Sequence, residues 1–122
     1  MDKFLGKKFV GYKRQKAVYK LLKEKHGYIT NAFHRKDIGS IALIWGNKTI
    51  GLAHIVNRRT QEKMDIKEFL SDISDVIEKG TISKGRLARF EILHRGKIAV
   101  IAPEIYENKL TFLLTAFKTR KK

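Results

Sequence analysis

Residues 38–60 read IGSIALIWGNKTIGLAHIVNRRT, and this stretch joins the two kinds of secondary structure that decide the fold. Its first part, Ile38–Trp45, is rich in residues that favour β-strands. Glycine, asparagine and lysine at 46–48 predict a turn. The next part, Gly51–Thr60, has apolar residues at helical spacing, and its apolar side carries Leu52, Ile55 and Val56. A strand that turns directly into a helix indicates a mixed α and β fold.

The sequence on either side places helices first and most strands last. An apolar stripe at steps of three and four predicts a helix over Asp65–Lys79, capped by Asp65 at its start and by a left-handed Gly80 at its end. Arg95 and Gly96 predict a tight hairpin. The other expected elements are a helix over Val10–Lys25 and strands over Tyr28–Phe33, Leu87–His94, Lys97–Ala102 and Lys109–Phe117. We therefore expect an α+β fold with helices packed on one face of an antiparallel sheet.

Length and composition exclude several classes of protein. The chain has 122 residues, which supports one compact domain over residues 1–122. Hydrophobic residues make up 43%, enough for a core and too many for a disordered chain. Cysteine is absent, which excludes disulfides, thiolate metal sites and a cysteine nucleophile. No apolar run approaches the roughly 20 residues that span a bilayer, so we expect no membrane partner.

The net charge is strongly positive and unevenly distributed. The chain has 27 Lys and Arg against 12 Asp and Glu, a net charge of +15 that favours a polyanionic partner. Residues 1–26 contain nine basic and two acidic residues, and four of the last five residues are basic. Residues 62–80 instead contain six acids and three lysines, a net charge of −3. We expect a basic working face and an acidic helix surface that faces solvent elsewhere; the alternative is a solvated surface with no partner.

The sequence lacks the motifs of several kinds of site. It has no glycine-rich phosphate loop, and none of its four histidines has an acidic neighbour at metal-ligand spacing. We therefore expect neither a metal nor a cofactor. Cleavage of RNA remains available without a metal, because the 2′-hydroxyl of the substrate is the nucleophile. Such a site needs a base, an acid, and cations or donors around the phosphorane.

The expected helix at 51–60 contains groups suited to this chemistry. His54 and Arg58 are four residues apart, and Asn57 lies between them on the same side, so all three can face one phosphate. Arg59 falls nearer the apolar side, where it could reach around or pack its stem. A solvated helical face explains this pattern about as well, and a lone histidine is more often structural.

Four short motifs in this order resemble one family of nucleases. They are Ile44–Gly46, Gly51–Ile55, the Ile-Glu-Lys-Gly stretch at 77–80, and Leu113–Phe117. Together they resemble the phage-type branch of the barnase–EndoU–colicin–RelE-like (BECR) nuclease superfamily, which occurs in phage proteins and toxin tips. The resemblance covers residues 28–118. It implies N-terminal helices on a roughly four-stranded antiparallel sheet, with a basic helical segment at 1–27 before this core and a basic tail at 119–122 after it.

The resemblance also implies an activity and residues for it. It implies metal-independent RNA cleavage that leaves a 2′,3′-cyclic phosphate, with His54 as the acid or base and Thr115 as a donor to the phosphate. Arg58, Arg59 and Arg89 are expected to clamp the phosphate; Arg89 matches a basic residue of the preceding strands, and its alternative is a surface charge. Relatives often carry a second histidine where this chain has Arg59, which cannot act as a general acid. His94 could take that role; otherwise Arg charge alone assists the leaving group.

Further residues are candidates for binding the substrate, each with a structural alternative. Arg86 could contact phosphate or be a strand surface charge, and Trp45 could stack on a base or belong to the core. Thr115 could equally be a sheet-forming residue without a role, and Asn57 a solvent-facing one. The tyrosines at 12, 19 and 28 are expected to pack in the ordinary way.

Two other functions compete with RNA cleavage. The first is a non-catalytic module that grips RNA or DNA phosphates with the basic first helix and tail. In the second, the polyanionic partner is a protein: an acidic inhibitor or immunity protein would suit this surface, since a toxin-like nuclease must be neutralised in its own cell. The expected location is the cytoplasm, or the cytoplasm of a target cell if the protein is a toxin.

Overall fold

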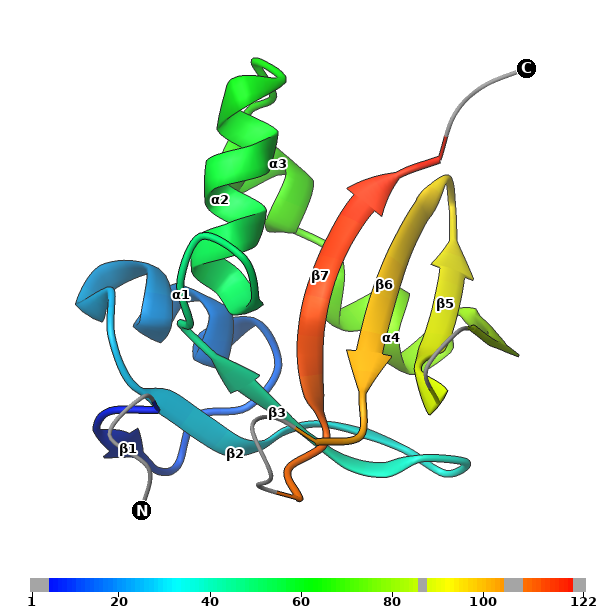
Figure 1. Cartoon of the computed structure of the whole chain (residues 1–122), viewed down its shortest axis with the longest axis horizontal. Helices are drawn as coiled ribbons and strands as arrows, with labels where there is room; N and C mark the ends of the chain where they lie inside the picture. The colour runs from blue at the N-terminus through cyan, green and yellow to red at the C-terminus, as the bar shows by residue number, and fades with distance from the viewer. Residues whose placement is uncertain (1–4, 86–87, 105–108, 120–122) are drawn as a thin grey trace.

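A computed structural model describes residues 5–85, 88–104 and 109–119 (Figure 1). Within them lie four helices and seven strands joined in one sheet. The helices are α1 (Gln15–Glu24), α2 (Gly51–Gln61), α3 (Ile66–Leu70) and α4 (Ile73–Lys79). The strands are β1 (Lys8–Phe9), β2 (Tyr28–Arg35), β3 (Gly39–Ile44), β4 (Thr81–Lys84), β5 (Phe90–His94), β6 (Lys97–Ala102) and β7 (Phe112–Lys118). No helix in these ranges is long and apolar enough to cross a membrane.

The sheet confirms the α+β class but is larger than expected and not purely antiparallel. Its strand order is β1-β2-β3-β7-β6-β5-β4. The pairs β2–β3, β4–β5, β5–β6 and β6–β7 are antiparallel, whereas β1 runs parallel to β2 and β3 runs parallel to β7. The two unexpected strands, β1 and β4, are the short edges of the sheet. These two segments form strands because they pair with a neighbouring strand, and not because apolar and polar residues alternate along their own sequence.

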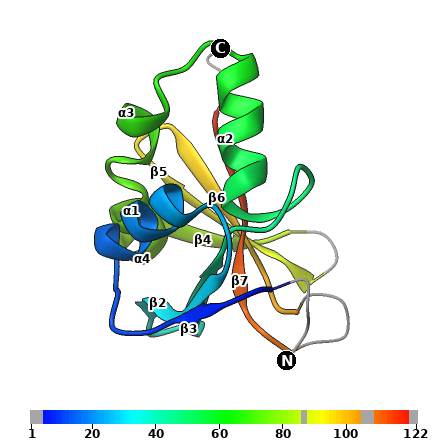
Figure 2. The same cartoon turned by 90° about the vertical axis from the view of Figure 1, so that its left-hand side faces the viewer.

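Helix α2 lies beside the weakest junction of the sheet, between β3 and β7. β3 and β7 are bridged at one residue pair, Ala42 and Phe112, and α2 contacts both strands. Leu52 and Ile55 of α2 are fully buried in the main core beside these strands. Seen from the side, α1, α3 and α4 gather on one side of the sheet, and α2 lies beside β7, where it also contacts α3 (Figure 2). The polar side of α2 is therefore presented away from the core.

The helix expected over residues 65–79 is two helices, α3 and α4. The Asp65 cap is confirmed, because its carboxylate accepts a hydrogen bond from the Glu68 amide at 3.2 Å. The helix is interrupted at Ser71, whose hydroxyl donates a hydrogen bond to the Glu68 carbonyl at 2.7 Å. The left-handed cap at Gly80 is wrong, because its φ of −71° and ψ of 169° are extended. A side chain at Gly80 would collide with the carbonyl oxygen of Val76, so close packing explains this glycine.

The expectation that the acids of this region face solvent holds only in part, because the three acids at 72, 75 and 78 are half-buried and paired with basic residues. The carboxylate of Asp72 accepts a hydrogen bond from the Lys97 ammonium at 2.7 Å. Asp75 and Glu78 both pair with the guanidinium of Arg14, the residue that precedes α1. The hydrogen bond from Arg14 holds the pKa of Asp75 below its usual range. The acids therefore fasten α4 to the start of α1 and to β6.

Candidate functional site

The polar side of α2 presents the three side chains singled out from the sequence. His54 and Asn57 are half-buried and Arg58 is exposed. Because a helix advances 100° per residue, the three lie within one turn on the side opposite Leu52 and Ile55. A ligand that approaches α2 from solvent can therefore meet an imidazole, an amide and a guanidinium together.

A hydrogen bond fixes the ring of His54. Its Nδ1 atom lies 2.7 Å from the carbonyl oxygen of Lys48. A carbonyl can only accept, so Nδ1 carries the proton in this contact and Nε2 of the neutral ring keeps its lone pair. This is the tautomer that a general base needs.

The loop that supplies this carbonyl is built around Asn47. The Asn47 Oδ1 atom accepts hydrogen bonds from the Thr49 amide at 2.8 Å, the Thr49 hydroxyl at 2.7 Å and the Ile50 amide at 3.2 Å. The Asn47 amide in turn donates to the Ile50 carbonyl at 3.0 Å. These bonds close the loop over Lys48 and hold its peptide against His54.

Two glycines make this loop geometry accessible. Gly46 and Gly51 have φ angles of 74° and 83°, which L side chains rarely adopt. A Cβ on Gly46 would lie 2.1 Å from the Ile50 carbonyl oxygen, and one on Gly51 would lie 2.9 Å from the carbonyl oxygens of Ile44 and Trp45. The motif glycines are therefore required by the turn that anchors the histidine.

Arg59 has a different environment from Arg58. It is 5% exposed, and its guanidinium donates to the Ala116 carbonyl at 2.6 Å and to the Glu62 carboxylate at 2.9 Å. Its Nε atom is buried without a hydrogen-bond partner in the described structure. The guanidinium lies 6.0 Å from the centre of the Phe69 ring. Arg59 joins α2 to β7 and α3, so we correct its assignment as a phosphate clamp to a structural one.

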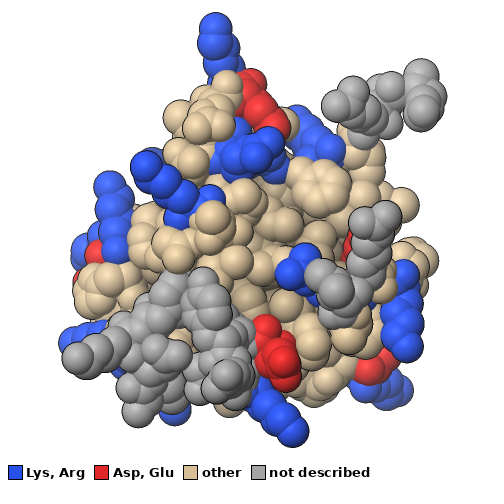
Figure 3. All heavy atoms as spheres, in the orientation of Figure 1, with Lys and Arg blue, Asp and Glu red and all other residues tan. Residues whose placement is uncertain are grey.

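Thr115 lies on β7, the strand that α2 contacts. It is half-buried and pairs with Val100 of β6, at a bulge in the β6–β7 ladder. Its neighbours Leu113 and Ala116 belong to the main core, whereas Leu114 and Val100 belong to a second cluster on the opposite face. In Figure 1 no helix lies over the near face of β5, β6 and β7. Figure 3, in the same orientation, shows Lys and Arg side chains around an uncharged area there.

The remaining candidates are dispersed. Arg89 is half-buried just before β5, and Arg86 lies outside the described residues. His94 ends β5 and pairs with Lys97, while β7 and β6 separate that strand from α2, so His94 is not brought to His54. Trp45 is half-buried against the main core, and its carbonyl accepts the Ala53 amide at 2.7 Å.

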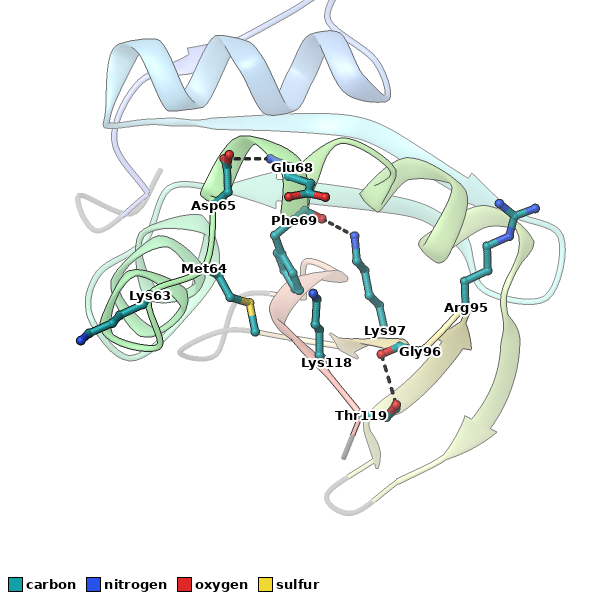
Figure 4. A pocket seen from close by; sticks show the side chains of 10 residues that line it. All are labelled: Lys63, Met64, Asp65, Glu68, Phe69, Arg95, Gly96, Lys97, Lys118 and Thr119. Carbon is teal, nitrogen blue, oxygen red and sulfur yellow. Dashed lines mark hydrogen bonds between the residues drawn. The ribbon is translucent and has the colours of Figure 1, made fainter. Parts of the chain in front are cut away.

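A hollow of about 650 Å³ lies beyond the end of α2 (Figure 4). Met64 and the buried Phe69 give it apolar walls, and Lys97 is held inside it by the Phe69 carbonyl at 2.8 Å. Its other polar lining residues include both acids and bases. Among the described residues, no group of three or more His, Asp or Glu is placed to hold a metal ion.

A comparison with protein families identifies the class of protein to which this α+β fold belongs. The model of the phage Barnase–EndoU–colicin E5/D–RelE-like nuclease 1 family matches residues 32–122. The chain belongs to this nuclease family. No curated protein and no solved structure matches the chain.

Proposed function

We propose that the protein is a metal-independent endoribonuclease in which Nε2 of His54 takes the proton of the RNA 2′-hydroxyl. One observation carries the proposal, the hydrogen bond of 2.7 Å between Nδ1 of His54 and the Lys48 carbonyl. It directs the basic nitrogen of the ring away from the loop, on the same side of α2 as Asn57 and Arg58. Family membership supports a nuclease, and the choice of RNA rests on this histidine.

The reaction begins with attack of O2′ on the adjacent phosphorus while Nε2 accepts the proton. In the imidazolium that forms, Nδ1 keeps its proton and still donates it in a hydrogen bond to the Lys48 carbonyl oxygen, which stabilises the new positive charge. The bond from phosphorus to O5′ then breaks. The products are a 2′,3′-cyclic phosphate and a free 5′-hydroxyl.

The phosphorane gains negative charge on its oxygens, and Arg58 is the exposed cation one turn from His54. We assign Arg58 to this charge, with Thr115 of the neighbouring strand β7 as a further donor; Arg89 directly precedes β5, the strand of His94, and is not assigned to it. His94 is not placed to protonate the leaving oxygen as a general acid, because its strand β5 is two strands away from β7. Arg58 stabilises this oxygen as it leaves and water protonates it, so turnover is slow for a ribonuclease.

One experiment with three labelled strands of the same sequence tests the proposal. The strands are RNA, DNA, and RNA with a single 2′-deoxy residue at a mapped cleavage position, all incubated in excess EDTA. We expect cleavage of RNA, none of DNA, and loss of only the substituted position in the third strand. Cleavage of DNA, or loss of RNA cleavage in EDTA, would contradict the mechanism.

A second function, non-catalytic binding of nucleic acid, is favoured by the net charge of +15. It predicts steeply salt-dependent binding of RNA and DNA alike, with no product from any of the three strands.

A further inference from the structure

The segment before the family match has its own surface. Residues 1–31 precede the match and contain nine basic residues and two acids, a net charge of +7. The described part of this segment forms β1, α1 and the first half of β2. We propose that the outer face of α1 is a binding surface for single-stranded RNA, separate from the chemistry on α2. The inference rests on the proposed function, because it assigns the strand being cut as the ligand.

Helix α1 buries one side and presents a basic, aromatic side. Ala17, Val18 and Leu21 are fully buried. The opposite side carries Lys16, Tyr19, Lys20 and Lys23, which together with Tyr12 line a shallow groove of about 340 Å³. The only acid on α1, Glu24, is paired with Lys20 at 2.8 Å. The groove-lining residues therefore contribute positive charge and no negative charge.

Lys20 orders the aromatic floor of this groove. Its ammonium is held by the Glu24 carboxylate and lies 5.2 Å from the centre of the Tyr12 ring and 4.9 Å from that of Phe9. The hydrogen bond with Glu24 raises the pKa of Lys20 above its usual value. Lys20 is thus charged at neutral pH and lies against the Tyr12 ring in the absence of a ligand.

Tyr19 is exposed in a way that packing does not explain. It is 49% exposed, whereas Tyr28 is 3% exposed and belongs to the second core cluster. Lys16 and Lys23 lie one turn before and one turn after it on the same side of α1. An aromatic ring flanked by cations matches a strand with unpaired bases, because the ring stacks on a base while the lysines contact the phosphates on either side.

The chemistry favours a single strand over other polyanions. A duplex keeps its bases stacked inside and would leave Tyr19 without a partner. An acidic protein would use the lysines but gain no base stacking. In Figure 3, Lys and Arg side chains lie over α2 and over the neighbouring part of α1, so one strand can pass from one helix to the other.

Binding of a strand that cannot be cut tests this inference. The probe is a fluorescent 2′-O-methyl RNA of about 20 nucleotides, in which the nucleophile is blocked, and affinity is measured by anisotropy at several salt concentrations. We expect Tyr19→Ala to weaken binding about 10-fold. We expect Lys16→Gln with Lys23→Gln to reduce the slope of log affinity against log salt by about 1.4, which is about 0.7 for each phosphate that is no longer neutralised.

The matched control is Lys36→Gln with Lys67→Gln. It removes the same charge from exposed positions on the β2–β3 turn and on α3. Equal losses in the control and the α1 variants, or wild-type binding by Tyr19→Ala, would overturn the inference. Equal weakening of a duplex of the same sequence would also overturn it.

The two proposals fail separately. If the wild-type protein cuts no RNA but Tyr19→Ala weakens the probe as expected, the surface on α1 stands and the proposed nuclease mechanism is wrong. If RNA is cut but the α1 variants bind the probe like the wild type, the mechanism stands and this surface is wrong.

Discussion

Arg58 and Arg59 are adjacent in the sequence, and the structure predicts opposite consequences for their removal. Arg58 is exposed beside His54, whereas Arg59 is 5% exposed and donates to the Ala116 carbonyl. We expect Arg58→Ala to slow cleavage without changing stability. We expect Arg59→Ala to reduce stability while the folded protein cleaves at nearly the wild-type rate.

The stability loss for Arg59→Ala follows from its contacts. Two methylenes leave a buried site at about 0.8 kcal/mol each, and the Ala116 carbonyl loses a donor, which costs about 1–3 kcal/mol. Removal of the Nε–H group, which is buried without a hydrogen-bond partner in the described structure, stabilises the variant by about 1 kcal/mol and offsets part of this loss. The net loss is about 2–4 kcal/mol, or a Tm lower by roughly 10 °C for a domain of this size. For Arg58→Ala, loss of one charge-assisted hydrogen bond lowers kcat by about 10- to 100-fold.

The assay combines thermal unfolding with single-turnover cleavage of RNA well below the Tm of each variant. Lys67→Ala is the control for the loss of one exposed positive charge. If Arg59→Ala keeps the wild-type Tm but loses cleavage, the structural assignment of Arg59 is wrong. If Arg58→Ala cleaves no more slowly than Lys67→Ala, Arg58 has no role in the reaction.

Three further predictions concern the loop, the sheet and the acids of α4. Asn47→Ala removes three hydrogen bonds that hold the loop over His54, so we expect kcat to fall about 10-fold. Asn47→Asp keeps the acceptor oxygen, so most of the wild-type kcat should remain, and equal kcat in the two variants would refute the role of the loop. Thr115→Val removes a hydroxyl but keeps the shape, so kcat should fall about 10-fold with a Tm within about 3 °C of the wild type, and an unchanged kcat would make the residue a sheet former only. Arg14 lowers the pKa of Asp75, so this pair contributes stability above the unfolded-state pKa of about 4, and the contribution is lost as the pH falls through the lower folded-state pKa. Urea unfolding at several pH values should show a smaller acid loss in Arg14→Gln, and identical pH profiles would contradict it.

Local signals predicted the local parts of the fold. The strand, turn and helix of residues 38–60 carry their own β-formers, turn residues and apolar spacing, and β3 and α2 follow them closely. The edge strands β1 and β4 were missed because they depend on pairing with β2 and β5. The break at Ser71 was missed because the apolar spacing continues across it.

The start of the first helix shows the same limit. The apolar Val10 suggested an earlier start, yet it is 70% exposed, and α1 begins at Gln15. The side chain of Gln15 donates to the Leu70 carbonyl at 3.0 Å and accepts from the Ser74 hydroxyl at 2.7 Å. These contacts with α3 and α4 lie more than 50 residues away along the chain, beyond the reach of helical periodicity.

The candidate site was predictable in its side chains but not in its geometry. His54, Asn57 and Arg58 are recognisable because helical spacing places them on one side. The partner of His54 is a backbone oxygen of Lys48, which has no residue signature, although Asn47 between two glycines indicated a turn. Spacing placed Arg59 near the apolar side, but its partner on β7 is 57 residues away in the sequence.

The role of His54 is tested by the rate at which His54→Ala cleaves RNA, measured in EDTA together with its affinity for the uncleavable 2′-O-methyl strand. We expect cleavage to fall by about 100-fold or more, as for loss of a general base, while the Tm and the affinity for the strand stay close to those of the wild type. We also expect the wild-type products to end in a 2′,3′-cyclic phosphate. Undiminished cleavage by His54→Ala, or wild-type products that end in a 5′-phosphate, would show that His54 is not the general base of this reaction.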